Sequence, residues 1–72
     1  MSTMHVLDTS GDRVIEFDRT DEASLAAAEQ AMQEHLARGG AMIRTKPGDP
    51  EVIREFDPGA EELVAIPQIQ GG

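Results

Sequence analysis

The sequence predicts a small α+β protein in which one main helix packs across a mixed sheet. Three observations favour this class. Residues 21–38 have the spacing of an amphipathic helix, short apolar runs on both sides have the spacing of strands, and segments containing Gly and Pro separate them. The 72 residues can enclose one small hydrophobic core, so we expect a single domain.

The first two elements are predicted to form a β-hairpin. Apolar side chains occur in residues 4–7 and 13–17, and in the second run Ile15 and Phe17 alternate with other residues at the period of a half-buried strand. Gly11 lies in the segment between the two runs, where it suits a left-handed position in a tight loop. We therefore expect two short antiparallel strands.

The next element is predicted to be the helix, over residues 21–38. Thr20 or Asp21 can accept backbone N–H bonds at its start, and the acidic residues there suit the positive end of the helix dipole. Residues 39–40 are both glycine and should end the helix, the first of them in a left-handed conformation. Apolar residues spaced three or four apart should form the face that packs on the sheet: Leu25, Ala28, Met32 and Leu36.

Three further strands are predicted at residues 41–45, 51–56 and 63–66, which gives the order β-β-α-β-β-β. The turn at 46–50 contains two prolines, and residues 57–61 suit one short helical turn. Pro67 should stop the last strand from pairing further, except at a sheet edge. The sheet is expected to meet the helix through four apolar side chains: Ile15, Phe17, Ile43 and Phe56.

The chain is strongly acidic, with 14 acidic and 6 basic side chains and a net charge of −8 at pH 7. Nucleic acids and acidic lipid surfaces should repel it, because binding phosphate groups needs a basic face. A protein with a basic surface is the electrostatically favourable partner. Five carboxylates in the last third of the chain form either a docking surface for that partner or a solvated strand edge that discourages pairing: Glu51, Glu55, Asp57, Glu61 and Glu62.

Catalytic and metal-binding residues are not predicted. The chain has no cysteine, which removes disulfides, thiolate nucleophiles and thiolate metal ligands. His5 and His35 lie far apart in the sequence and lack the spacing of a metal-binding pair. The Ser and Thr hydroxyls have no plausible base or oxyanion loop. We therefore expect that the protein is not an enzyme.

Residues 1–5 carry neither the basic start nor the apolar run of a secretory signal. No stretch approaches the roughly 20 apolar residues that are needed to span a bilayer. The expected location is therefore the cytoplasm, without membrane association.

The sequence closes on Gly71 and Gly72, directly after an apolar strand, Pro67 and the residues Gln68, Ile69 and Gln70. Glycine has no Cβ atom, so a tail of this kind can pass through a narrow enzyme channel and present its carboxylate to ATP. The pattern indicates a compact domain over residues 1–67 and an extended tail over 68–72.

Residues 61–72 resemble the ending of ubiquitin-like sulfur carriers, such as the small subunit of molybdopterin synthase, and of bacterial ubiquitin-like modifiers. The resemblance implies a β-grasp fold and a partner ATPase that adenylates Gly72, after which sulfur or an amine attacks. Gly71 would provide clearance, and Pro67 and residues 68–70 would be recognised along the channel. The chain itself would be a substrate that holds no permanent cofactor, with ATP used by the partner.

One departure from the family pattern leaves its function open. A single Pro67 stands where sulfur carriers often have two prolines, so the motif does not separate a sulfur carrier from a protein modifier, or a sulfur-transfer partner from an acceptor protein. A different class also fits the sequence, a small acidic assembly protein of phage or plasmid origin that adds its tail as a strand to a neighbour. A weaker third class is an antagonist that mimics acidic nucleic acid.

Overall fold

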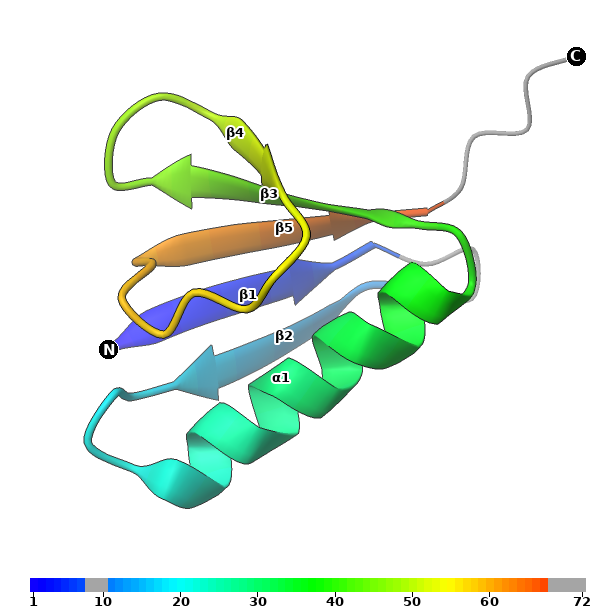
Figure 1. Cartoon of the computed structure of the whole chain (residues 1–72). Helices are drawn as coiled ribbons and strands as arrows, with labels where there is room; N and C mark the ends of the chain where they lie inside the picture. The colour runs from blue at the N-terminus through cyan, green and yellow to red at the C-terminus, as the bar shows by residue number, and fades with distance from the viewer. Residues whose placement is uncertain (8–10, 68–72) are drawn as a thin grey trace, which may run out of the picture.

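The computed structural model describes residues 1–7 and 11–67 and has one helix packed on a five-stranded mixed sheet (Figure 1). The predicted α+β class and the order β-β-α-β-β-β are confirmed. The elements in chain order are β1 (Ser2–Val6), β2 (Arg13–Phe17), α1 (Glu22–Ala37), β3 (Ala41–Lys46), β4 (Glu51–Ile53) and β5 (Glu62–Ile66).

The sheet has the strand order β2-β1-β5-β3-β4. Strands β1 and β5 are parallel neighbours, and the other three neighbouring pairs are antiparallel. The first and last strands of the chain therefore lie side by side in the middle of the sheet (Figure 1). Since β5 has a partner on each side, Pro67 follows a central strand and not an edge strand.

Local signals fix both ends of α1, as predicted. The Asp21 carboxylate accepts hydrogen bonds from the amides of Ala23 and Ser24, at 3.1 and 3.4 Å, which satisfies two of the free N–H groups of the first turn. At the other end Gly39 has a φ of 89° and donates its N–H to the Leu36 carbonyl at 2.9 Å. This left-handed conformation favours glycine and ends the helix.

The core lies between α1 and one face of the sheet. Its largest fully buried side chains come from four strands and the helix: Phe17, Met4, Met32, Met42 and Leu63. The aromatic ring of Phe56 packs on Phe17 with the ring centroids 5.3 Å apart. Phe17 and Phe56 therefore meet near the helix as expected, and Ile15 packs at the border of this core.

The prediction for β3 is wrong in one respect, because Met42 and not Ile43 faces the helix. Met42 is fully buried, whereas Ile43 is only partly buried. Successive side chains of a strand point to opposite faces, so the two residues cannot share the core face. Both are apolar, and the local alternation therefore gives no signal for which of them turns inward.

The buried face of α1 also differs from the prediction. Ala28 and Met32 are buried as expected, but the third buried residue is His35. Leu25 and Leu36 are partly buried and pack at the border of the core. The buried stripe thus runs along the helix at spacings of four and three residues and ends on a polar side chain.

Two predicted strand boundaries change by two or more residues, and others change by one. Strand β1 starts at Ser2, two residues earlier than expected, and β4 ends at Ile53. Phe56 consequently lies in the connection between β4 and β5 and not in a strand. The turn expected near Asp57 is present as a single hydrogen-bonded turn, in which the Ala60 amide donates to the Asp57 carbonyl at 3.1 Å.

Candidate functional site

The described part of the predicted site is the end of β5, where the chain leaves the sheet. The other expected tail residues, Gln68 to Gly72, lie outside the described residues. Pro67 is exposed and directly follows Ile66, the last residue of β5. Because Pro67 has no N–H group, it cannot donate to a neighbouring strand, and sheet pairing stops at this point.

The end of β5 is joined to the helix by His35. This side chain is only 7% exposed, and its Nε2 atom is hydrogen-bonded to the carbonyl oxygen of Ile66. The imidazole ring lies against Gly40, where an added Cβ atom would come within 2.6 Å of the ring's Cδ2 atom. A side chain at position 40 would therefore displace the ring from its place.

Sequence reasoning did not find this contact, although a weak signal for it exists. His35 follows Met32 by three residues and Ala28 by seven, so it lies on the buried face of α1. A polar residue on a buried helix face needs a hydrogen-bond partner. That partner comes from β5, 31 residues further along the chain, and the helix pattern alone does not reveal it.

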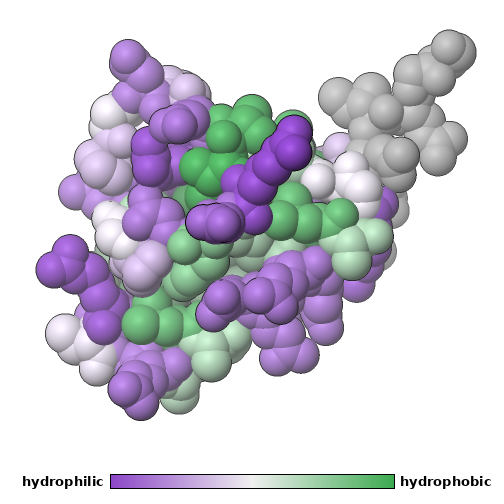
Figure 2. Space-filling view, in the orientation of Figure 1, coloured by the Kyte–Doolittle hydropathy of each residue, from purple (hydrophilic) through white to green (hydrophobic). Residues whose placement is uncertain are grey.

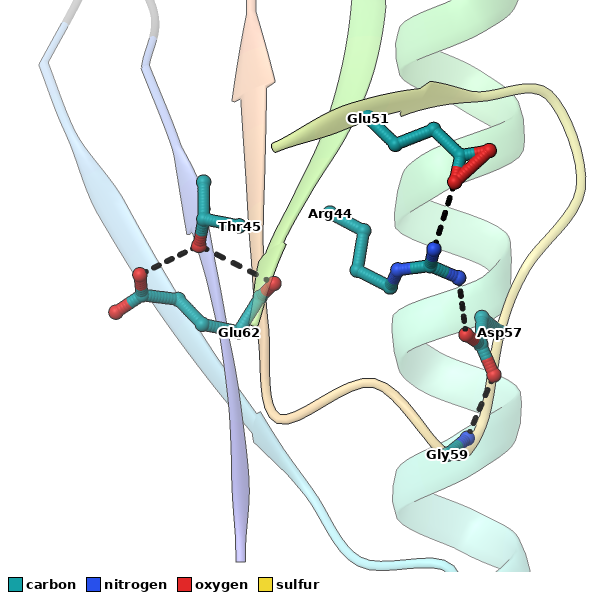
Figure 3. A network of polar contacts seen from close by, with 6 residues as sticks. All are labelled: Arg44, Thr45, Glu51, Asp57, Gly59 and Glu62. Atoms are coloured by element: carbon teal, nitrogen blue, oxygen red, sulfur yellow. Dashed lines mark hydrogen bonds and ion pairs between the residues drawn. The ribbon is translucent and has the colours of Figure 1, made fainter. Parts of the chain in front are cut away.

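The acidic residues of the last third do not lie in one patch. Glu51 and Asp57 both bind Arg44, with N–O distances of 2.7 and 3.0 Å (Figure 3). The Asp57 carboxylate also accepts the Gly59 amide at 2.9 Å. Asp57 thus holds the β4–β5 connection against β3, Glu51 ties β4 to the same arginine, and the single guanidinium offsets part of their combined charge.

Glu62 has a different setting, on the sheet face that points away from α1. Its carboxylate accepts the Thr45 hydroxyl at 2.6 Å (Figure 3) and lies 3.6 Å from the His5 Nε2 atom. The hydrogen bond from Thr45 is the main reason why the Glu62 pKa is lowered, and the charge of Lys46 contributes as well. Glu61 and Glu55 are exposed.

Removing the Thr45 hydroxyl should raise the Glu62 pKa. A carboxyl group whose folded-state pKa is depressed stabilises the fold above its unfolded-state pKa, and this stability is lost as the pH falls through the folded-state pKa. We expect Thr45→Val to move the NMR titration of the Glu62 carboxyl carbon to higher pH. In the matched control Thr3→Val, whose side chain lies on the same face, the titration should stay in place. Equal titrations in both variants would contradict the assigned cause.

An apolar row crosses the sheet on this open face. Register pairs place one residue of each strand side by side, in the order Val14, His5, Val64, Ile43 and Val52. The two outermost valines are 59% and 64% exposed. The carboxylates of Glu16 and Glu62 lie in the next row, beside Thr3. We call these five aligned residues, four apolar side chains and His5, the apolar row; Glu16 and Glu62 form an acidic margin on one side of it.

The apolar row was not predicted, because it depends on strand pairing. Its five residues come from five strands that are spread along the chain, and its exposed valines look like ordinary strand residues. Ile66 belongs to the same face as Val64, since alternate residues of β5 point the same way. The chain therefore leaves the sheet from the strand that also supplies the centre of the row.

A groove lies on the helix side of the molecule, between α1 and the segment after β4. It has a volume of about 400 Å³, with Met32, Leu36 and Phe56 as its apolar lining and Glu29, Gln33, Arg54 and Glu55 as its polar lining. Figure 2 shows apolar surface in this view, crossed and bordered by hydrophilic side chains. Among the described residues, no group of three His, Cys, Asp or Glu side chains is placed to hold a metal ion.

In residues 1–7 and 11–67, no helix has the length and apolar character to cross a membrane. Comparisons with protein-family models, with curated proteins and with solved structures give no match to this chain.

Proposed function

We propose that the chain is a ubiquitin-like carrier or modifier with a β-grasp fold. A carboxylate at Gly72, either as the native end or after processing, is activated by a partner ATPase. The observation that carries the proposal is the position of β5, the strand that leads into Pro67 and the two glycines. It is the central strand, paired with β1 on one side and β3 on the other, so the tail starts from a well-anchored base.

The chemistry requires little of the chain itself. A carboxylate oxygen of Gly72 attacks the α-phosphorus of ATP, pyrophosphate leaves, and the acyl-adenylate is then attacked by sulfur or an amine as AMP leaves. The partner supplies the nucleotide site and the catalytic groups in the cytoplasm. The chain supplies a narrow tail and a surface that docks on the enzyme, so it acts as a substrate and has no cofactor of its own.

The apolar row and its acidic margin suit a partner surface with an apolar centre and basic side chains at its rim. A few residues near the centre of an interface carry most of its binding energy, and rim charges mainly affect the association rate. Glu16 and Glu62 supply rim carboxylates, and Glu61 lies one residue before β5. The docking role of Glu51 and Asp57 is reduced in this proposal, because Arg44 already pairs with both.

Placing a positive charge in the row should weaken docking. We expect Val52→Lys to raise the KM for the chain by about fivefold or more, since the lysine faces basic groups of the activating enzyme. Val52 is 64% exposed, so the substitution should leave the fold intact. Gln30→Lys adds the same charge to the exposed side of α1 and is the matched control, expected to behave like the wild type. If both variants showed the same KM, docking through this face would be excluded.

Deleting residues 71–72 separates the proposed function from the assembly alternative. A carrier without its diglycine has no usable carboxylate and should lose all adenylation, measured as ATP–pyrophosphate exchange with the ATPase. An assembly protein that uses its tail as an added strand should keep most of its activity, because strand addition depends on backbone hydrogen bonds further upstream. If the chain still assembles with its neighbour after the deletion, the assembly protein is favoured.

A further inference from the structure

We propose that His35 is a positioning residue that sets the direction in which the chain leaves the sheet after Ile66. The contact itself stands on the described residues, and its consequence for activation rests on the proposed function. His35 is the buried polar residue of the core face, and its ring reaches from α1 to the last carbonyl of β5.

The Ile66 carbonyl is the last backbone acceptor before Pro67. The β3·β5 ladder ends at the pair Ala41 and Ile66, and the β1·β5 ladder ends one residue earlier, at Ala65. Among the described residues, the last hydrogen bond from the β1 side goes from the Leu7 amide to the Ala65 carbonyl at 2.9 Å. A side chain of the helix thus supplies a partner at the point where the strand ladders stop.

The position of the ring is fixed by the chain that follows the helix. The Gly40 amide donates to the backbone carbonyl of His35 at 3.2 Å, and the Gly40 backbone leaves room for the imidazole. Ala41, the next residue, pairs with Ile66. His35, Gly40, Ala41 and Ile66 therefore form one closed unit, which we call the exit junction.

The exit junction determines the tautomer of His35. A carbonyl oxygen can only accept a hydrogen bond, so the Nε2 atom of His35 must carry the proton that it shares with Ile66. This tautomer is a property of the folded chain and does not depend on an activating enzyme. The hydrogen bond requires the Nε2–H form in the neutral ring, with the proton shielded from water.

The consequence for activation is a lower cost of ordering the tail. An enzyme that receives the tail must fix it in one direction, and a base that already points in one direction leaves fewer conformations to exclude. Losing the His35 donor should therefore raise the KM for the chain and leave kcat nearly unchanged, because the reacting carboxylate is untouched.

The first experiment records the ring nitrogens of His35 by long-range ¹H–¹⁵N NMR of the folded wild-type chain. We expect the Nε2–H tautomer, with slow exchange of that proton with water. The Nδ1–H tautomer would overturn the proposal, because an unprotonated Nε2 atom cannot donate to the Ile66 carbonyl.

The second experiment compares His35→Leu, which has no donor, with His35→Gln, which keeps an N–H donor. Glu34→Leu is the matched control, an exposed neighbour on α1 that receives the same new side chain. Residual dipolar couplings of the Cα–Hα bonds of Ile66 and Pro67 report the order of the exit. They should shrink in His35→Leu, be largely restored in His35→Gln, and match the wild type in Glu34→Leu. Unchanged couplings in a folded His35→Leu would overturn the proposal.

The activity assay keeps this inference separate from the proposed function. In ATP–pyrophosphate exchange with the partner ATPase, the KM should rise about threefold to tenfold for His35→Leu and return to within about twofold of the wild type for His35→Gln. If the wild type is adenylated and His35→Leu has the same KM as the wild type, the positioning role of His35 is wrong and the proposed function still stands. A wild type that is never adenylated would end the proposed function, and the NMR results would still decide the exit junction. If His35→Leu fails to fold, the His35 tautomer of the wild type and the dipolar couplings of His35→Gln test the positioning role.

Discussion

Gly72→Ala is expected to be adenylated about tenfold to a hundredfold more slowly than the wild type. Under the proposed function, the added methyl group would collide with a channel of the activating enzyme that is shaped for glycine, and overpacking of this kind costs about 1–3 kcal/mol. Extending the chain by one residue past Gly72 should abolish the reaction, because the carboxylate then lies beyond the position of the ATP α-phosphorus. Both effects are measured as pyrophosphate exchange, or as the mass of the acyl-adenylate, with the cognate ATPase and ATP.

Gln70→Ala is the matched control for this prediction, since it changes the same tail by removing a side chain. It should lose less activity than Gly72→Ala, because a shorter side chain creates no collision. If Gly72→Ala reacts as fast as the wild type, the two glycines are not shaped for a narrow channel. If the extended chain is also adenylated, the two glycines do not set the position of the reacting carboxylate.

Met32→Ala should cause a large loss of stability, about 2–5 kcal/mol. Met32 is 1% exposed and lies in the buried cluster between α1 and the sheet, so its truncation leaves a cavity. A whole domain is stabilised by only about 5–15 kcal/mol, and a chain this short lies towards the lower end of that range. Urea unfolding followed by circular dichroism should therefore show a much lower midpoint.

Leu36→Ala is the matched control, because Leu36 lies one turn further along α1 and is only partly buried. Its loss should be smaller, since neighbouring side chains and water can fill part of the space. A loss that is equal to or larger than that of Met32→Ala would mean that the buried face of the helix is assigned wrongly. The sequence alone grouped both residues on one face without ranking them.

The helix shows how far local signals reach. Thr20 or Asp21 was predicted to cap its start and Gly39 to end it; the structure has Asp21 as the cap and Gly39 after the helix, because capping depends on hydrogen bonds within a few residues. In β3 the prediction chose Ile43 for the core and the structure places Met42 there. Neighbouring apolar residues do not reveal which face is buried, since that is set by the strands on either side.

The candidate site depends even more on contacts between distant residues. The diglycine and Pro67 can be read directly from the sequence, and they carry the functional hypothesis. The pairing of Arg44 with Glu51 and Asp57 could not be read in this way, because it joins β3 to two segments that follow it. The acidic cluster therefore looked uniform in the sequence, although two of its members share an ion pair with Arg44.

The sequence by itself determined the α+β class, the order of the elements and the limits of the helix, because side-chain periodicity and capping are local properties. Only the tertiary structure decided that β5 lies between β1 and β3, that five aligned residues form an apolar row, and that His35 binds the Ile66 carbonyl. Each of these features joins residues far apart in the chain. They form when the strands pair and the helix packs on them, and a short stretch of sequence does not predict these contacts.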